Sequence, residues 1–341
     1  MRSKSTPRGP GLAVGLTYDL RDDYRAEGFL EEEVAEFDSE ETIRSLAETI
    51  ESLGHRVDRI GNAKALCRRL VGGDRWELVF NIAEGVRGRS REAQVPCLLE
   101  LYDIPYTFSD PLVSAITLDK EVAKRLVRQA GLNTPESAVV STAEDLPRVR
   151  LRYPLFAKPL AEGTGKGIDA RSRVETPEGL EEVCRDLLAR VRQPVLVEEY
   201  LPGREFTVGV LGTGEEARAI GTMEVGVLDG VESAVYGYVT KEECETLVRY
   251  SPVADPGLRA EAEDLSLRVH RALECRDASR VDIRLDRGGR PSFMEINPLP
   301  GLHPTHSDLP MVAAQEGMAY AELIGSIIES AKTRIGKVHG W

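Results

Sequence analysis

The stretch Arg280-Val-Asp-Ile-Arg-Leu-Asp-Arg-Gly-Gly-Arg-Pro-Ser-Phe-Met-Glu-Ile-Asn297 reads as a β-hairpin. Its turn is predicted at Gly288-Gly289, because paired glycines accept the positive φ angles of a tight turn. Apolar and polar residues alternate on both sides of that turn, which is typical of strands with one buried face. The segment therefore predicts two antiparallel strands that present chemically different surfaces.

With this turn, Asp282 lies opposite Glu295 and Arg280 lies opposite Asn297. Strand side chains alternate between the two faces of a sheet. One face is therefore expected to carry Arg280, Asp282, Arg284, Phe293, Glu295 and Asn297. The other face is expected to belong to the core, with Val281, Ile283, Leu285, Met294 and Ile296. Pro291 leaves a shifted register open as an alternative.

Carboxylate and amide oxygens gather on the polar face of this hairpin. Mg²⁺ is typically held by one or two carboxylates, with water and phosphate oxygens completing its shell. Asp282, Glu295 and Asn297 therefore form a candidate metal site. The alternative is a solvated face with a cross-strand charge pattern. Opposed carboxylates repel each other unless a cation lies between them, which favours the metal.

The composition is that of a globular protein with more than one core. At 341 residues the chain exceeds the size, roughly 250–300 residues, at which a single hydrophobic core stops growing. The net charge of −13 disfavours nucleic-acid partners and anionic membranes. No apolar run approaches the ~20 residues of a membrane span. Five dispersed cysteines without CxxC spacing indicate reduced thiols in a cytoplasmic protein.

The order of the predicted elements divides the chain into three units. Residues 1–10 are basic, contain proline and glycine, and are expected to be a disordered tail. In residues 11–112, apolar runs alternate with helical segments, as in an α/β domain with a parallel sheet. Residues 113–202 begin with a helix predicted over Ser114–Ala130, and residues 203–341 contain the hairpin and a final helix.

A glycine-rich loop, Glu162-Gly-Thr-Gly-Lys-Gly-Ile168, follows an apolar strand that ends in Lys158. The amides of Gly163 and Gly165 can approach phosphate oxygens closely, because glycine has no side chain. The spacing is neither that of a P-loop nor that of a dinucleotide fold. A plain surface loop is an equal alternative for the loop alone, and Lys158 beside it favours an anion site.

The next apolar strand delivers Glu198 to a Tyr-Leu-Pro-Gly linker, and another strand begins at Glu205. Carboxylate and backbone acceptors beside Tyr200 and Leu201 suit an adenine amino group and ribose hydroxyls. The alternative is a domain linker with solvated glutamates.

These segments, in this order, resemble the ATP-grasp superfamily and are most similar to the D-alanine–D-alanine ligases. The resemblance covers nearly the whole chain and is strongest in Asp103–Thr107, Ala115–Lys120, Phe156–Pro159, Glu198–Val208 and Asp282–Gly301. It implies a three-domain ATP-grasp fold, of mixed α/β class, whose N-terminal domain has a parallel sheet. It also implies ATP with Mg²⁺ or Mn²⁺, and a homodimer.

The resemblance further implies which residues bind the nucleotide and the metal. The phosphates of ATP would contact Lys120, Lys158 and, from a mobile loop, Lys241. The adenosine would lie against Glu198, Tyr200, Leu201 and Glu205. The metal ions would be bound by Asp282, Glu295 and Asn297.

Other roles implied by the resemblance concern the reaction itself. Arg280 and the amide of Gly301 would stabilise a tetrahedral oxyanion. Thr164 stands where the family has the serine of its glycine loop and keeps the hydroxyl. Glu31 would hold the ammonium group of the first amino acid, within a glutamate run that leaves a shift of one or two positions open.

The implied reaction is amide formation. One substrate's carboxylate attacks the γ-phosphorus of ATP to give an acyl phosphate, and the amine of a second amino acid or short peptide displaces phosphate. Two alternatives are an ATP-grasp phosphotransferase without an amine acceptor and a non-catalytic nucleotide-binding regulator. The regulator is disfavoured because Lys158, Arg280 and both metal carboxylates are present.

The substrate side departs from the family pattern. Residues 81–92 replace a substrate-facing segment and bring three arginines between glycines, with Arg89 and Glu92 as candidate substrate contacts. The alternative for this segment is a solvated loop. Further candidate contacts follow in the C-terminal loop, namely His303, His306 and Ser307. The sequence therefore predicts the same chemistry with an altered substrate pair.

Overall fold

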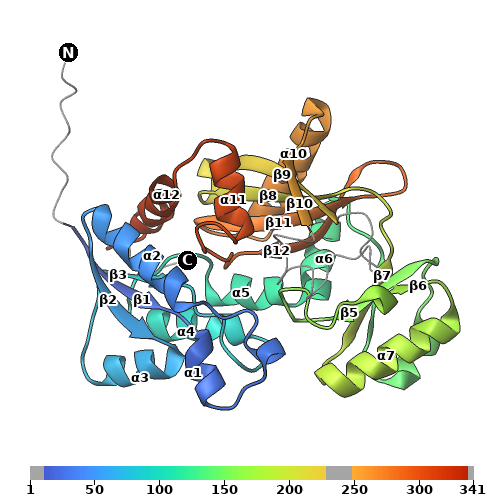
Figure 1. Ribbon diagram of the computed structural model, residues 1–341, viewed down its shortest axis with the longest axis horizontal. Coiled ribbons are helices and arrows are strands. Elements are labelled where there is room, and N and C mark those ends of the chain that lie inside the picture. Colours follow the sequence, from blue (N-terminus) through green and yellow to red (C-terminus); the bar gives the residue numbers. More distant parts are fainter. Residues whose placement is uncertain (1–10, 228–247, 337–341) are drawn as a thin grey trace.

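A computed structural model describes residues 11–227 and 248–336, and Figure 1 shows how its helices and strands are arranged. Three separate β-sheets are joined by helices, so the predicted mixed α/β class is confirmed. The expected tail at residues 1–10 and the predicted Lys241 contact lie outside the described residues. Within the described ranges, no helix is both long and apolar enough to cross a membrane.

The first sheet is parallel, as predicted, with strand order β2-β1-β3. Its strands are β1 (Ala13–Thr17), β2 (Arg56–Gly61) and β3 (Leu78–Asn81). The helices of this unit are α1 (Arg21–Ala26), α2 (Glu40–Ser52), α3 (Ala63–Val71) and α4 (Gln94–Leu101). Helix α2 begins after Ser39, whose hydroxyl accepts a hydrogen bond from the amide of Thr42 at 3.2 Å.

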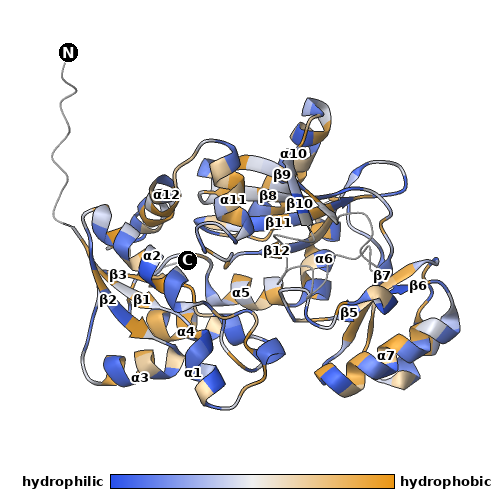
Figure 2. Ribbon diagram, viewed as in Figure 1, coloured by the Kyte–Doolittle hydropathy of each residue, from blue (hydrophilic) through white to orange (hydrophobic). Residues whose placement is uncertain are grey.

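The second sheet is antiparallel, with strand order β4-β7-β5-β6. Its strands are β4 (Ser137–Val140), β5 (Leu155–Pro159), β6 (Arg173–Val174) and β7 (Val195–Glu199). Helix α7 (Pro177–Val191) packs on this sheet through Leu180, Val183 and Leu187. Figure 2 shows the apolar character of these strands beside a helix with one polar side. The amphipathic pattern of α7 thus places it as a cover for the sheet.

The third sheet has five antiparallel strands in the order β10-β9-β8-β11-β12. They are β8 (Glu205–Leu211), β9 (Arg218–Val227), β10 (Val248–Pro252), β11 (Ala278–Leu285) and β12 (Pro291–Asn297). Helix α10 (Pro256–Ala272) packs on this sheet through Leu265 and Val269. The predicted hairpin at Arg280–Asn297 is therefore formed by β11 and β12, at one side of the largest sheet.

The two C-terminal helices join the third unit to the first. Helices α11 (Asp308–Gln315) and α12 (Tyr320–Lys332) follow the hairpin in sequence. Leu323 and Ile327 of α12 are fully buried in the same apolar cluster as Leu16 of β1 and Ile43 of α2. Because both units share this core, the residues that lie between them are held by a common support.

The helix predicted over Ser114–Ala130 is two helices, α5 (Pro111–Leu118) and α6 (Lys120–Gln129). The break lies at Asp119, whose backbone is extended (φ −85°, ψ 96°) and whose side chain accepts from the amide of Val122 at 3.0 Å. This single-helix prediction was wrong because an N-cap aspartate within the apolar pattern starts a new helix. The break places Lys120 in the first turn of α6.

The register of the hairpin is as predicted near its open end and differs near its turn. Arg280 pairs with Asn297 and Asp282 pairs with Glu295, but a β-bulge follows and Ile283 pairs with Phe293. A bulge inserts one extra residue into one strand and reverses the facing of the residues beyond it. Phe293 is consequently buried in the core, whereas Met294 faces a cavity. The predicted faces of these two residues were therefore interchanged.

Five 3-10 helices complete the described structure. They span Glu31–Glu33, Arg91–Ala93, Ala143–Arg148, Ala170–Ser172 and Gly214–Glu216.

Candidate active site

A cavity of about 850 Å³ is lined by residues of all three units. Eleven of the predicted catalytic, substrate, nucleotide and metal residues border it, namely Glu92, Lys120, Gly163, Thr164, Arg280, Glu295, Asn297, Gly301, His303, His306 and Ser307. Its volume lies in the range of about 300–1,000 Å³ that is usual for small-molecule sites. Folding therefore gathers residues from distant parts of the sequence around one space.

A smaller cavity of about 50 Å³ lies between the second and third sheets, and its lining contains four of the nine predicted nucleotide-binding residues and two of the predicted metal ligands. These are Lys120, Lys158, Gly165, Glu205, Asp282 and Glu295. Lys120, Glu162 and Glu295 line both cavities. The two spaces therefore meet at a junction that carries one lysine and two carboxylates.

The buried carboxylate of Glu198 is held by two lysines. Its oxygens lie 2.8 Å from Nζ of Lys158 and 2.9 Å from Nζ of Lys124. Burial would raise the pKa of Glu198, but the two positive charges outweigh it and lower the pKa to about 2. Burial lowers the pKa of Lys124, whereas the Glu198 carboxylate outweighs burial at Lys158 and raises its pKa. Both lysines are thus locked in place by one glutamate.

Lys124 was missed by the sequence argument. Its side chain is completely buried, and its Nζ also bonds Thr134 Oγ1 at 3.2 Å. The available signal was its position four residues after Lys120 on the predicted helix, which places both on one helix face.

The predicted metal residues form a polar patch on the hairpin. Asp282 bonds the guanidinium of Arg280 at 2.9 Å and the hydroxyl of Thr207 at 2.8 Å. Glu295 lies 3.4 Å from Nζ of Lys120. The side-chain oxygen of Asn297 accepts from the amide of Leu299 at 3.0 Å. The carboxylates are therefore balanced by cationic side chains in this structure.

Residues 11–227 and 248–336 contain no group of three or more His, Cys, Asp or Glu side chains that could hold a metal ion by themselves. The hairpin instead supplies two cross-strand carboxylates, Asp282 and Glu295, and one amide oxygen. That donor set fits Mg²⁺, which keeps several water ligands and typically shares one or two carboxylates with a bound phosphate group. The residues thus fit a metal that enters together with a nucleotide.

Arg280 lies beside the loop that contains Gly301. Its guanidinium bonds Asp282 at 2.9 Å and Asp308 at 3.1 Å. A side chain at Gly301 would meet the Ser307 hydroxyl at 2.8 Å, so glycine allows this close approach. The Ser307 hydroxyl also accepts from the amide of His303 at 2.9 Å. A fixed guanidinium and a glycine that line one cavity are suited to a site for an anion.

The glycine-rich loop is docked against the first unit. The amide of Gly163 donates to the carboxylate of Glu36. Thr164 and Gly165 have positive φ angles of 49° and 67°. Lys120 donates to the carbonyl of Glu162 at 2.5 Å. One of the predicted phosphate-binding amides is thus occupied by a carboxylate oxygen, which shows that it can hold an anionic oxygen.

Tyr200 lies between arginines and not in either cavity. Its ring lies 6.5 Å from that of Phe156 and 5.2 Å from the guanidinium carbon of Arg284. Arg284 in turn lies 3.4 Å from Glu205, which borders the smaller cavity. Leu201 likewise does not line either of the two cavities. The predicted adenine contacts are therefore only partly gathered in this structure.

The structure places Glu31 and Arg89 away from the cavity. Glu31 is exposed and bonds Arg25 at 2.6 Å, and its pKa is lowered by that hydrogen bond. The Arg89 side chain is 71% exposed and pairs with Asp119 at 2.5 Å. Neither side chain lines the cavity into which the resemblance would place it.

Three carboxylates that sequence reasoning did not single out as a group line the cavity near residue 91. Glu36 bonds the buried guanidinium of Arg91 at 2.6 Å. Glu84 and Glu92 border the same cavity. Burial raises the pKa of Glu92 to about 7, although Arg91 lowers it and Glu36 raises it further. Burial, then Glu92 and Glu36, raise the pKa of Glu84. This part of the cavity is an acidic wall.

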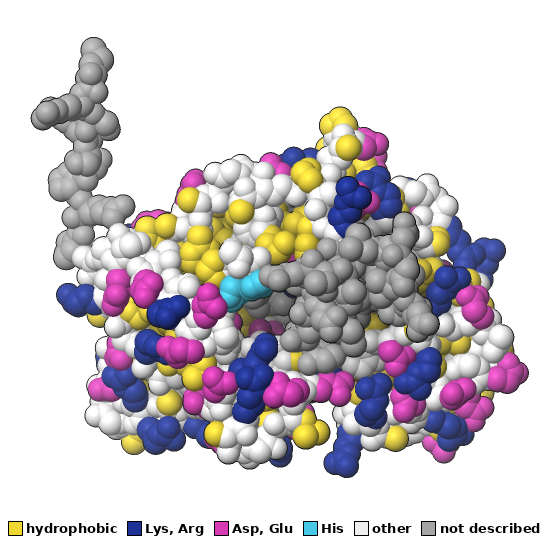
Figure 3. All heavy atoms as spheres, viewed as in Figure 1, with side chains coloured by type: hydrophobic (Ala, Val, Ile, Leu, Met, Phe, Trp, Pro, Cys, Tyr) yellow, Lys and Arg dark blue, Asp and Glu magenta, His cyan; other side chains and the backbone are white. Residues whose placement is uncertain are grey.

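The two predicted histidines lie together at the cavity. The rings of His303 and His306 are 4.5 Å apart, and Figure 3 shows histidine side chains at the surface in the middle of the drawn face. Nδ1 of His303 accepts from the amides of Thr305 and His306, each at 3.3 Å. Burial and the neighbouring His306 lower the pKa of His303. The two amide donors favour the His303 tautomer with its proton on Nε2.

The three units, with lysines and carboxylates gathered where two cavities meet, have the fold of a solved D-alanine–D-alanine ligase. Residues 126–329, more than half of the chain, match the family model described as the D-ala D-ala ligase C-terminus. The chain therefore belongs to the D-alanine–D-alanine ligase family.

Two relatives and one solved structure illustrate what this chain is similar to. A D-alanine–D-alanine ligase of Aquifex aeolicus (strain VF5) is 33% identical over 288 residues, which cover 84% of this chain and 93% of the relative. An uncharacterized protein, y4sG, of Sinorhizobium fredii (strain NGR234) is 35% identical over 266 residues, or 75% of each chain. A crystal structure of a D-alanine–D-alanine ligase from Bacillus anthracis, complexed with ATP, superposes with a TM-score of 0.71. It is 21% identical and covers 95% of this chain and 98% of that one.

Proposed function

We propose that this protein is an ATP- and Mg²⁺-dependent carboxylate–amine ligase that joins two amino acids, or an amino acid and a short peptide. The observation that carries this proposal is the junction between the two cavities, where Lys120, Glu162 and Glu295 border both. A nucleotide in the smaller cavity would present its terminal phosphate there, to a substrate carboxylate held in the larger one. Family membership supports the same chemistry.

The nucleotide would be held by residues of the second and third sheets. Lys120 and Lys158 would bind its phosphates, with Glu198 fixing the direction of Lys158 by the 2.8 Å ion pair. Glu205 would accept from the ribose, and Tyr200 with Leu201 would border the adenine. The amides of Gly163 and Gly165, and Lys241 outside the described residues, would add phosphate contacts.

Asp282, Glu295 and Asn297 would hold Mg²⁺, which supplies neutralisation of the phosphate charge when bound. The chain's own groups would then position the reactants. Arg280 and the amide of Gly301 would stabilise the oxyanion that forms when the amine attacks the activated carboxyl carbon. The Thr164 hydroxyl lines the same cavity and would contact the substrate.

The substrate side rests on the residues that border the larger cavity. Ser307 would donate to the second substrate's carboxylate, and His303 with His306 would form the wall beside it. Glu36, which lines the cavity, would take the position that the resemblance gives to Glu31. Attack of the first carboxylate on the γ-phosphorus gives an acyl phosphate and ADP. The amine then forms the C–N bond, releases phosphate and gives up a proton.

We also propose a domain organisation of 11–112, 113–202 and 203–341, and a homodimer in the cytoplasm. The three sheets support the domains. The described cysteines Cys67, Cys97, Cys184 and Cys275 are free thiols, which supports a reducing compartment. The dimer is supported by the resemblance alone.

Phosphate release from ATP and Mg²⁺ across a panel of D- and L-amino acids, singly and in pairs, tests the proposal. The expected result is release that requires an amine acceptor, with a dipeptide of the corresponding mass as product. A stable phosphorylated product formed without an amine would instead identify a phosphotransferase. No release with any pair, together with intact nucleotide binding, would identify a regulator.

A further inference from the structure

The acidic wall of the larger cavity, which Asp38 extends, has more carboxyl groups than bonded cations. The four carboxyl groups belong to Glu36, Asp38, Glu84 and Glu92. Arg91, buried behind the wall, donates to Glu36 at 2.6 Å. Burial, then the charge of Asp19, raise the pKa of Asp38 to about 7, while the charge of Arg21 lowers it. Glu36 therefore has a bonded cation, whereas Glu84 and Glu92 have none among the described residues.

Glu92 lies where its ionised form needs a partner, because burial raises its pKa to about 7. Its side chain borders the cavity, and the residue is only 8% exposed. Among the described residues, its carboxylate makes no hydrogen bond and no ion pair, and the same holds for Glu84. Buried carboxylates in proteins are normally paired or hydrogen-bonded. An unpartnered one that faces an open cavity is therefore a site for a cation supplied by a ligand.

The number of carboxyl groups in the acidic wall distinguishes between ligands with one ammonium group and ligands with two. An ordinary amino acid offers one ammonium group, which can contact Glu36 in addition to Arg91 and the amide of Gly163. A second ammonium group is needed to neutralise the wall beyond that contact. Lys120, whose charge acts on Glu92, borders the junction with the smaller cavity. The unpartnered carboxylates therefore lie close to the place where a substrate carboxyl group would react.

We propose that one substrate of this ligase is a diamino acid, whose side-chain ammonium group is bound by Glu84 and Glu92. This assignment rests on the proposed ligase function and adds the substrate class. Lysine and ornithine have the required groups, and the cavity of about 850 Å³ has room for such a side chain.

Binding of matched ligands to the full-length protein tests the assignment. Lysine is compared with norleucine, and ornithine with norvaline, as D- and L-forms by calorimetry, because each pair differs chiefly by the ammonium group. In the wild type we expect the diamino acid of one enantiomer to bind at least about tenfold more tightly than its neutral counterpart. Equal affinity of lysine and norleucine, and of ornithine and norvaline, overturns the assignment without any variant.

Two variants locate the contact. Glu92→Gln and Glu84→Gln should each reduce the preference for the diamino acid about tenfold, because one charged hydrogen-bond acceptor is lost. Glu48→Gln, on the exposed side of α2, is the matched control and should keep the wild-type preference. Thermal melting confirms that each variant is folded. A preference that survives in both cavity variants overturns the assignment to Glu84 and Glu92.

Phosphate release separates this inference from the proposed function. Release that is stimulated by neutral amino acids and no better by diamino acids overturns the substrate class while the ligase function stands. Absence of release with every amino acid overturns the ligase function itself. Release that is stimulated at least about tenfold more by a diamino acid, at a limiting concentration, is the expected result.

Discussion

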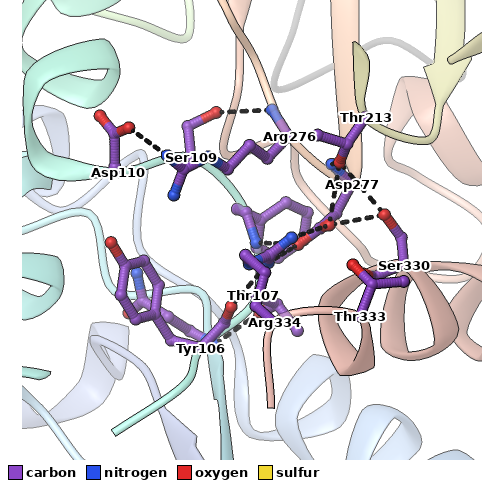
Figure 4. A network of polar contacts seen from close by, with 12 residues as sticks. Tyr106, Thr107, Ser109, Asp110, Thr213, Arg276, Asp277, Ser330, Thr333 and Arg334 are labelled. Atoms are coloured by element: carbon purple, nitrogen blue, oxygen red, sulfur yellow. Dashed lines mark hydrogen bonds and ion pairs between the residues drawn. The ribbon is translucent and has the colours of Figure 1, made fainter. Parts of the chain in front are cut away.

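The guanidinium group of Arg334 forms a two-point ion pair with the buried carboxylate of Asp277, with nitrogen–oxygen distances of 2.8 and 2.5 Å (Figure 4). Asp277 directly precedes β11, and Arg334 follows α12. The same carboxylate accepts from the amide of Phe108, in the first unit, at 2.7 Å. Ser330 of α12 donates to it at 2.7 Å. One side chain thus fastens the site-bearing hairpin to the first unit and to the last helix.

Replacement of Asp277 should destabilise the whole protein. Asp277→Ala leaves the guanidinium of Arg334 and the amide of Phe108 without their acceptor, and loss of one member of a buried pair costs about 3–5 kcal/mol. Chemical denaturation should show this loss. Glu329→Ala, which removes an exposed ion pair to Lys332 on the same helix, should cost less than about 1 kcal/mol. Similar stabilities of the two variants would contradict the role given to Asp277.

Glu295→Ala should abolish turnover while the protein stays folded. Its carboxylate borders both cavities and is one of the two proposed metal carboxylates, so its loss should lower kcat at least about 100-fold and raise the Mg²⁺ concentration needed for nucleotide binding. Phosphate release and nucleotide binding across a Mg²⁺ titration measure both effects. Arg290→Ala, near the exposed turn of the same hairpin, is the control. Normal activity of Glu295→Ala would contradict the assignment of Glu295 as a metal ligand.

The two lysines of Glu198 should respond differently to replacement by methionine. Lys158 borders the smaller cavity, whereas Lys124 is fully buried and borders neither cavity. Lys158→Met should raise the KM for ATP roughly 10- to 100-fold, because a hydrogen bond between charged groups is lost. Lys124→Met should mainly lower the melting temperature and change that KM less than about threefold. Equal KM values for the wild type and Lys158→Met would exclude a phosphate contact.

The hairpin shows how far a local pattern can predict structure. Its turn and the pairing of Asp282 with Glu295 follow from the two glycines and from strand alternation. The bulge beyond that pair could not be predicted locally. The amide of Phe293 donates to the carbonyl of Asn133 at 2.8 Å, and its carbonyl accepts from Thr134 at 2.9 Å. These contacts come from a distant segment, and they turn Phe293 into the core.

The residues of the candidate site also divide into those that a sequence pattern could predict and those that it could not. The predicted metal residues and Lys158 lie on regular strands, so sequence order and alternation pointed to them, whereas Lys120 was proposed from the resemblance. The acidic wall is assembled from single residues of separate loops, such as Glu36 and Glu84, and no periodic pattern links them. Glu31 was chosen from a glutamate run by resemblance, whereas the folded chain turns Glu36 to the cavity. Such choices depend on tertiary packing.

The acidic wall should make stability depend on pH in a direction opposite to that of an ordinary surface carboxylate. Burial raises the pKa of Glu92 from 4.5 to about 7, so between these values the folded protein binds a proton that the unfolded chain lacks. The stability from this group is therefore present at low pH and is lost as the pH rises through about 7.

Glu92→Gln removes this titration. At about pH 8 the variant should be more stable than the wild type by roughly 1–3 kcal/mol, and at about pH 5 most of that difference should vanish. Denaturant titrations of both proteins at the two pH values measure it, with Glu48→Gln as the exposed control. If the stability difference between Glu92→Gln and the wild type is the same at both pH values, the ligand-free cavity does not hold an ionised Glu92 without a partner. A diamino acid should narrow the difference at about pH 8, because its second ammonium group stabilises the ionised Glu92 only in the wild type.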